Sequence, residues 1–197
     1  MKFSFFLFIF PIIVFCQETK EQIAERLRPA KSKIVHGVIQ QEIWGNKDAI
    51  IAFYETRYID STSTTQKYER QYIEGYLYIK KNENYEKVLI AKFEDDNVDT
   101  NIESVFFANA DKDKVKELII ISTVVHRLQY LYEGTEYSTS VFDDFKIGKT
   151  PKKLEELYDM NNKLSGGLEG YMEGNGNRKS KIKTAVDVKK KLKKLGY

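Results

Sequence analysis

The stretch YIEGYLYI, residues 72–79, decides the fold of this 197-residue chain. Its even-numbered positions carry three tyrosines and one glutamate, whereas its odd-numbered positions carry isoleucine, glycine and leucine. Side chains alternate between the two faces of a β-strand, so a period of two predicts a strand whose faces differ. We therefore expect a strand over residues 68–79.

Similar stretches flank this strand on both sides. Strands are predicted over residues 34–44, 49–59, 85–93, 102–108, 117–132 and 135–142, with a tight hairpin turn at Glu133-Gly134. No connector between them is long enough for a crossover helix, so consecutive strands should be antiparallel. The expected fold is α+β, namely an antiparallel β-sheet or sandwich of about seven strands with a C-terminal amphipathic helix.

Helical patterns occur near the two ends of the mature chain. A short amphipathic helix ended by Pro29 is predicted over residues 18–28, and a turn or two of helix over residues 154–160. The glycine-rich residues 164–177 predict a bent strand or an irregular segment. Ile182, Ala185, Val188, Leu192 and Leu195 recur at spacings of three and four, which predicts a helix over residues 181–195 with its lysines outside. We expect Leu192 and Leu195 to pack against the sheet.

The first sixteen residues predict a secretory signal peptide. Lys2 is followed by an apolar run from Phe3 to Phe15 interrupted only by Ser4, which is shorter than the roughly 20 residues of a membrane-spanning helix. Cleavage after Cys16 leaves residues 17–197 as a single β-rich domain without cysteine, exported to the periplasm or secreted. Acylation of Cys16 as a lipoprotein is the alternative, although the bulky Phe15 departs from that signal.

A resemblance accompanies this leader. The Phe/Ile-rich signal that ends in Cys-Gln, followed by a body rich in Lys, Tyr and Asn, resembles small exported proteins of Bacteroidota. The resemblance implies an extracytoplasmic location.

Residues 109–117 carry oxygen-bearing side chains at alternate positions: Asn109, Asp111, Asp113 and Glu117. Such spacing lets a short loop surround Ca²⁺, which takes six to eight oxygens. The segment resembles the calcium loop of FG-GAP and VCBS-type repeats, which implies these four residues as ligands. It departs from that pattern at Lys114, where the family has glycine, and three lysines offset its acids. These departures favour an ordinary charged turn without a cofactor, with bound calcium as the alternative.

Catalytic motifs are missing from the sequence. It contains no G-x-S-x-G elbow, no H-E-x-x-H pair and no phosphate-binding glycine loop, and its two histidines fall within predicted strands. We therefore expect a protein that is not an enzyme. A hydrolase that uses a pair of carboxylates stays open, because the 29 acids supply many such pairs.

Two features of the sequence indicate surfaces that could bind a partner. Tyr72, Tyr76 and Tyr78 on one strand face could bind a protein or a glycan, unless the sheet buries them. The last twenty residues contain nine basic side chains and one acid, so the terminal helix could contact an anionic lipid, a glycan or a nucleic acid. We favour the alternative in which its apolar stripe lies on the sheet and its lysines are only hydrated. We expect no nucleic-acid partner for an exported protein. The predicted function is a non-enzymatic binding protein of the cell envelope, with a calcium-stabilised structural or adhesion module as the alternative.

Overall fold

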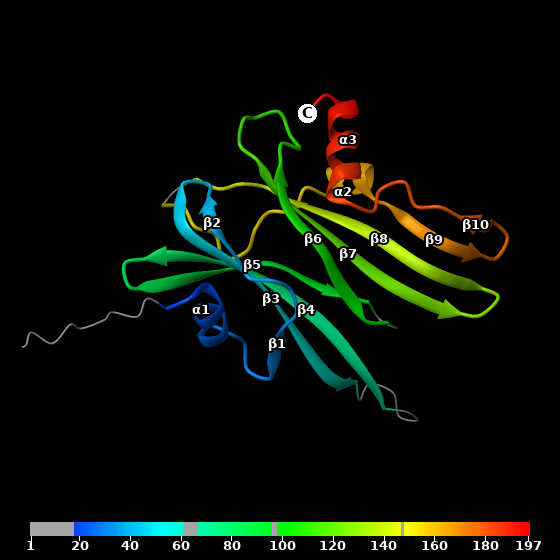
Figure 1. The fold of residues 1–197 in the computed structure, drawn as a ribbon, viewed down its shortest axis with the longest axis horizontal. Coiled ribbons are helices and arrows are strands. Elements are labelled where there is room, and N and C mark those ends of the chain that lie inside the picture. The colour runs from blue at the N-terminus through cyan, green and yellow to red at the C-terminus, as the bar shows by residue number, and fades with distance from the viewer. Residues whose placement is uncertain (1–17, 61–66, 96–97, 147) are drawn as a thin grey trace, which may run out of the picture.

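A computed structural model describes residues 18–60, 67–95, 98–146 and 148–197 (Figure 1). The predicted signal peptide, Cys16 and the cleavage point lie outside the described residues. Within them the chain forms three helices, α1 (Lys20–Arg26), α2 (Tyr158–Leu164) and α3 (Ala185–Leu195). None of these helices is both long and apolar enough to cross a membrane.

Ten strands in the described ranges form two antiparallel sheets. The first sheet has the order β1-β3-β4-β5, and β2 also pairs with β3. The second has the order β10-β9-β8-β7-β6. The strands are β1 (Ser32–Ile34), β2 (Ile39–Ile43), β3 (Asn46–Asp60), β4 (Tyr68–Lys81), β5 (Asn84–Glu94), β6 (Thr100–Ala108), β7 (Glu117–Leu128), β8 (Tyr132–Phe142), β9 (Gly167–Met172) and β10 (Gly176–Arg178).

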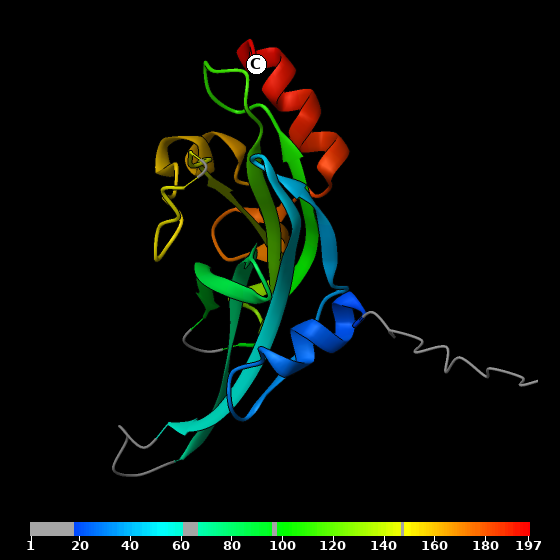
Figure 2. The same ribbon diagram turned by 90° about the vertical axis from the view of Figure 1, so that its left-hand side faces the viewer.

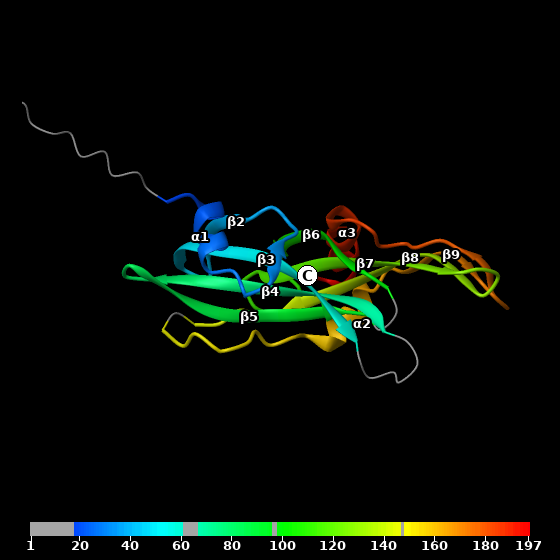
Figure 3. The same cartoon turned by 90° about the horizontal axis from the view of Figure 1, so that it is seen from below.

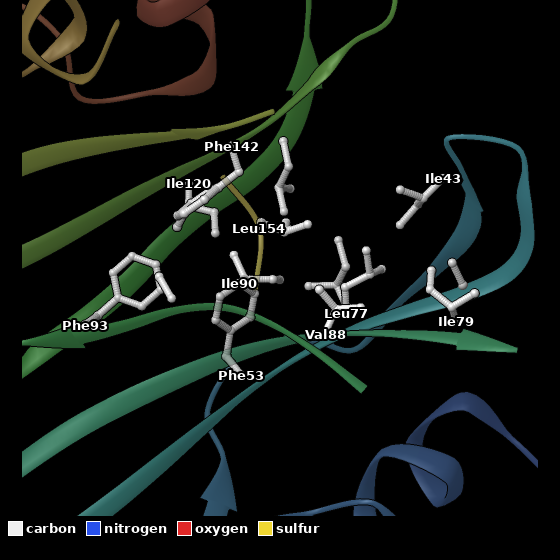
Figure 4. Close-up of a cluster of buried hydrophobic side chains, with 14 of the residues drawn as sticks. Ile43, Phe53, Leu77, Ile79, Val88, Ile90, Phe93, Ile120, Phe142 and Leu154 are labelled. Atoms are coloured by element: carbon white, nitrogen blue, oxygen red, sulfur yellow. The ribbon is translucent and has the colours of Figure 1, made fainter. Parts of the chain in front are cut away.

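The two sheets pack face to face over one apolar core. Phe53 and Leu77 from the first sheet meet Ile120 and Phe142 from the second, together with Leu154 from the chain after β8 (Figure 4). Figures 1 and 3 show that the sheets overlap over part of their length, and that β8 and β9 extend beyond the first sheet.

Helices cover the two outer faces, so that each sheet is buried on both sides over part of its area. Ile23 and Ala24 of α1 pack on the outer face of the first sheet. Met160 of α2 and Val188 and Leu192 of α3 pack on the outer face of the second. Figure 2 shows α1 against the first sheet and α3 against the second.

The predicted α+β class and the antiparallel arrangement are confirmed, with corrections in detail. Residues 34–44 do not form one strand. The chain pairs with β3 in β1, leaves it after Ile34, and pairs with it again in β2 from Ile39. The glycine-rich residues 164–177, predicted as one bent strand or an irregular segment, instead contain the end of α2 and most of the β9–β10 hairpin, which adds two strands. The second helix begins at Tyr158 and so lies later than the predicted 154–160.

The predicted turn at Glu133-Gly134 is wrong. β7 ends at Leu128 and β8 begins at Tyr132, so the turn lies between them, with Tyr130 at a φ of 67°. Gly134 instead pairs with Gly170 inside the sheet, where a Cβ on Gly134 would lie 2.2 Å from the carbonyl oxygen of Glu169. Gly134 therefore permits a close approach of two strands.

The C-terminal helix is shorter than predicted. It begins at Ala185, after a capping box in which Thr184 and Asp187 satisfy each other's backbone N–H groups. Leu192 is buried as expected, with 2% of its surface exposed. Leu195 is 38% exposed, so its predicted place in the core is wrong.

Candidate metal centre

The loop between β6 and β7, residues 109–117, is closed by the pairing of Ala108 with Glu117. β6 ends at Ala108 and Glu117 is the first residue of β7, so the two strands hold the ends of the loop together. Figure 1 shows the loop beyond the end of the second sheet, near the end of α3.

Hydrogen bonds within the loop hold the side chains of its aspartates against its own backbone. The Asp113 N–H donates to Asp111 Oδ1 at 2.7 Å, and the Val115 N–H donates to Asp113 Oδ1 at 2.6 Å. The Asn109 side-chain amide donates to the Asp113 carbonyl at 2.6 Å. Aspartates favour such turns because their side chains bond to backbone N–H groups two residues ahead. One oxygen of each aspartate is used in this way, and the other oxygen stays available.

Three of the four predicted ligands converge. Asp111, Asp113 and Glu117 each contribute a carboxylate oxygen, and these oxygens all lie within 4.8 Å of one another. Oxygens that bind one Ca²⁺ lie about 2.3–2.6 Å from the ion, which allows them to be about 5 Å apart. The spacing in the loop therefore suits a single calcium ion.

Glu117 is the most informative residue of the cluster, because its carboxylate is fully buried. Its Oε2 accepts a hydrogen bond from the Ala110 N–H. Its Oε1 is buried without a hydrogen-bond partner among the described residues, and so is Asn109 Oδ1. Buried acceptors without a partner are rare in folded proteins, and a bound ion is one kind of partner for them.

The electrostatics of the loop also favour a cation. Burial raises the pKa of Glu117 to about 7, and the charges of Asp111 and Asp113 add to the rise. Burial likewise raises the pKa of Asp143 and of Asp144, with Asp111 contributing in both cases. All five carboxylates would be stabilised in their charged form by a divalent ion.

The lysines of the loop do not neutralise these acids through ion pairs. Lys112, Lys114 and Lys116 are exposed, and none forms an ion pair with any residue in the described ranges. Lys114 is not among the residues of positive φ, so the chain turns there without the glycine of the family pattern. The Lys116 carbonyl accepts a hydrogen bond from the Trp44 indole at 2.8 Å.

The sequence reading missed the contribution of Asp143 and Asp144. These acids directly follow β8, and Phe142 pairs with Leu118 next to Glu117. Their position in the sequence, directly after the predicted strand that pairs with the strand beginning at Glu117, could have indicated that they lie near the loop.

The predicted tyrosine row is not an exposed face. Tyr78 is fully buried and Tyr76 is 8% exposed, while Tyr72 is half-buried. The reason is α1: the Tyr78 hydroxyl donates to the Leu27 carbonyl at 3.3 Å, and neighbouring Tyr54 donates to the Ala24 carbonyl at 2.8 Å. Of the three predicted residues, Tyr72 alone keeps a partly exposed side chain. The apolar side of the predicted first helix could have indicated that this helix packs on the face of the sheet that carries the tyrosines.

Comparison with known proteins adds no assignment, since no family model, no curated protein and no solved structure matches the chain.

Proposed function

We propose that this chain is a non-enzymatic, exported module that binds one Ca²⁺ ion in the 109–117 loop and is stabilised by it. The observation that carries the proposal is Glu117, a fully buried carboxylate that has one oxygen without a hydrogen-bond partner among the described residues and that lies in a cluster with the carboxylates of Asp111 and Asp113. Leaving such a group unpaired costs free energy, and a bound cation would remove that cost.

The chemistry of the ligands selects calcium. The cluster offers only carboxylate and amide oxygens, which suit hard cations, and it offers neither histidine nor cysteine, which zinc and copper prefer. The loop is built on flexible side chains, which suits Ca²⁺ better than the strict octahedron of Mg²⁺. Extracellular calcium modules have dissociation constants of about 10⁻⁴–10⁻³ M, and the predicted export would expose the site to such concentrations.

The role of the ion would be structural. Asn109 follows β6 and Glu117 begins β7, so one ion in the loop would hold together the ends of these two neighbouring strands. Such a role would suit an exported protein without catalytic motifs, because a bound ion would help it to keep its shape outside the cell.

The test is a thermal melt in millimolar Ca²⁺ and in EDTA. A ligand present at ten times its dissociation constant stabilises the native state by about 1.4 kcal/mol, so we expect a measurable rise in Tm in about 10 mM Ca²⁺. Asp113→Asn removes a ligand charge at an exposed position and should abolish the rise while leaving the fold intact. Trp44 is the single tryptophan and contacts the loop, so its fluorescence should change with Ca²⁺ as well.

The matched control is Glu133→Gln, which removes one exposed acid from β8 at a distance along the sheet from the loop. This variant should keep the full calcium response. An unchanged Tm in Ca²⁺ for the wild-type chain, or an equal response in Asp113→Asn, would contradict the proposal.

A further inference from the structure

The β9–β10 hairpin, the segment that follows it and α3 together line a basic pocket of about 780 Å³. This volume lies in the range of small-molecule sites, about 300–1,000 Å³. The pocket shares no residue with the 109–117 loop, so it is independent of the calcium proposal. Figure 1 shows the chain running from β10 to α3 on the side of the second sheet that carries the helices.

Cations from three elements surround this pocket, and one acid accompanies them. The cationic side chains are Lys163 of α2, Arg178, Lys179 and Lys181 from the end of β10 and the segment after it, and Lys190, Lys191 and Lys194 of α3. The acid is Asp187. Seven cations and one carboxylate produce a strongly positive site.

The single acid is already engaged elsewhere. Asp187 accepts hydrogen bonds from the Thr184 hydroxyl at 2.9 Å and from the Thr184 N–H at 3.1 Å, as part of the cap of α3. These bonds hold the pKa of Asp187 below its ordinary value. Within residues 18–60, 67–95, 98–146 and 148–197, no ion pair joins any of the seven cations to an acid. The described acids therefore form no ion pair with any of these cations, and an anion in the pocket would lower their mutual repulsion.

The remaining lining indicates what kind of anion fits. Ser165, Asn175 and Asn177 supply neutral donors and acceptors, and the apolar side chains are limited to Leu168 and Ile182. No aromatic side chain lines the pocket, so a nucleobase would find no stacking partner there, and an acyl chain would find little apolar surface. Hydroxyl and amide groups among cations match a ligand that combines many hydroxyls with several anionic groups.

We propose that this basic pocket binds an anionic saccharide, such as a segment of a sulfated or phosphorylated polysaccharide. The lysines pair with its ester oxyanions, and Ser165, Asn175 and Asn177 bond to its hydroxyls. The pocket takes a short segment of a longer chain, because it is open to solvent along α3, where Lys190 and Lys194 are exposed.

Calorimetric titration of the full mature chain with heparin, a sulfated polysaccharide, tests the proposal. We expect saturable binding that weakens as salt rises from 50 to 500 mM. Over this range the Debye length falls from about 14 to about 4 Å, so the attraction between the lysines and the anionic groups is screened. Lys190→Gln/Lys194→Gln should weaken binding at least about tenfold, equivalent to about 1.4 kcal/mol. Replacing two exposed lysines elsewhere, in Lys152→Gln/Lys153→Gln, changes the net charge equally and should leave the affinity within about twofold.

Parallel arms separate the proposal from other polyanions. A phosphorylated mannan in place of heparin distinguishes phosphate from sulfate esters, and binding of either supports the proposal. Equal or tighter binding of single-stranded oligothymidylate, or of vesicles containing phosphatidylglycerol, would overturn it in favour of general anion attraction. Equal loss of heparin binding in both double variants would overturn it too. Asp113→Asn should bind heparin normally, so failure of the calcium proposal would leave this result unaffected.

Discussion

Glu55 on β3 is a nearly buried carboxylate whose charge is balanced by two cations and which also accepts a hydrogen bond from a neutral amide. Its Oε1 lies 3.0 Å from Lys33 Nζ and 2.8 Å from Arg57 Nε, and Gln71 Nε2 donates to its Oε2 at 3.4 Å. Burial by itself raises the pKa of Glu55, but the hydrogen bonds from these three residues outweigh burial and hold the pKa below its ordinary value of 4.5. The same Gln71 bonds twice to the backbone of Thr100, so this cluster also ties β4 to β6.

The lowered pKa of Glu55 predicts how acid affects stability. The unfolded chain takes up a proton at Glu55 at a higher pH than the folded chain, so the stabilisation is complete above about pH 4.5 and disappears as pH falls through the folded pKa. Glu55→Gln should cost about 1–3 kcal/mol at pH 7, the worth of hydrogen bonds to a charged group. Denaturant unfolding of both proteins between pH 3 and 7 measures this difference.

The difference between wild type and Glu55→Gln should narrow below pH 4.5, because protonation removes the charge that the substitution also removes. The exposed Glu133→Gln change provides the reference profile, which should follow the wild type throughout. A gap that stays constant down to pH 3 would show that Glu55 acts through packing and not through its charge.

At the scale of elements, the two leucines of α3 differ in burial. Val188 and Leu192 lie against Ile119, Ile121 and Val141 in the cluster on the outer face of the second sheet. Leu195 belongs to the last turn, where the helix ends at Gly196 with a φ of 92°. The side chain of Leu195 is exposed there, so the end of the apolar stripe meets solvent.

Replacing the two leucines should therefore have unequal effects. Leu192→Ala should lower the free energy of unfolding by about 2–5 kcal/mol, because it opens a cavity under a buried side chain. Leu195→Ala should cost less than about 1 kcal/mol, as expected for a side chain that is partly exposed. Urea unfolding of each variant, compared with the wild type, measures both effects. Equal losses, or no loss for Leu192→Ala, would disprove the packing described for α3.

At the scale of the whole molecule, the inter-sheet core makes the two sheets depend on each other. Phe53 of the first sheet is fully buried in a cluster that includes Ile120 and Phe142 of the second. Since both sheets lose the same apolar contacts when either is disturbed, they should unfold together.

Phe53→Ala tests this dependence between the sheets. The change should cost about 3–5 kcal/mol, and Phe53→Leu provides a milder variant that keeps most of the buried volume. Hydrogen exchange followed by mass spectrometry should show faster exchange in peptides from β7 and β8 as well as from β3 and β4. Ile59→Ala, at a side chain that is 56% exposed, should leave all four strands unchanged. Faster exchange confined to β3 and β4 would show that the sheets open independently.

Patterns local in the sequence could be predicted, because they follow from the geometry of a single element. The period of two located most of β3 to β8, and the spacing of three and four located α3, since each period reflects how side chains leave a strand or a helix. The alternating acids of the 109–117 loop were also readable, because loop turns are set by neighbouring residues.

Only the tertiary structure decided which of these residues are covered and which meet one another. The alternation at residues 72–79 distinguished two strand faces, but burial of Tyr76 and Tyr78 depends on α1 packing on one of them. The buried Oε1 of Glu117 arises because β6, β7 and β8 end together around it, and the basic pocket collects lysines from α2 and α3. Burial and charge pairing depend on contacts between residues far apart in the chain, which the preferences of single segments do not encode.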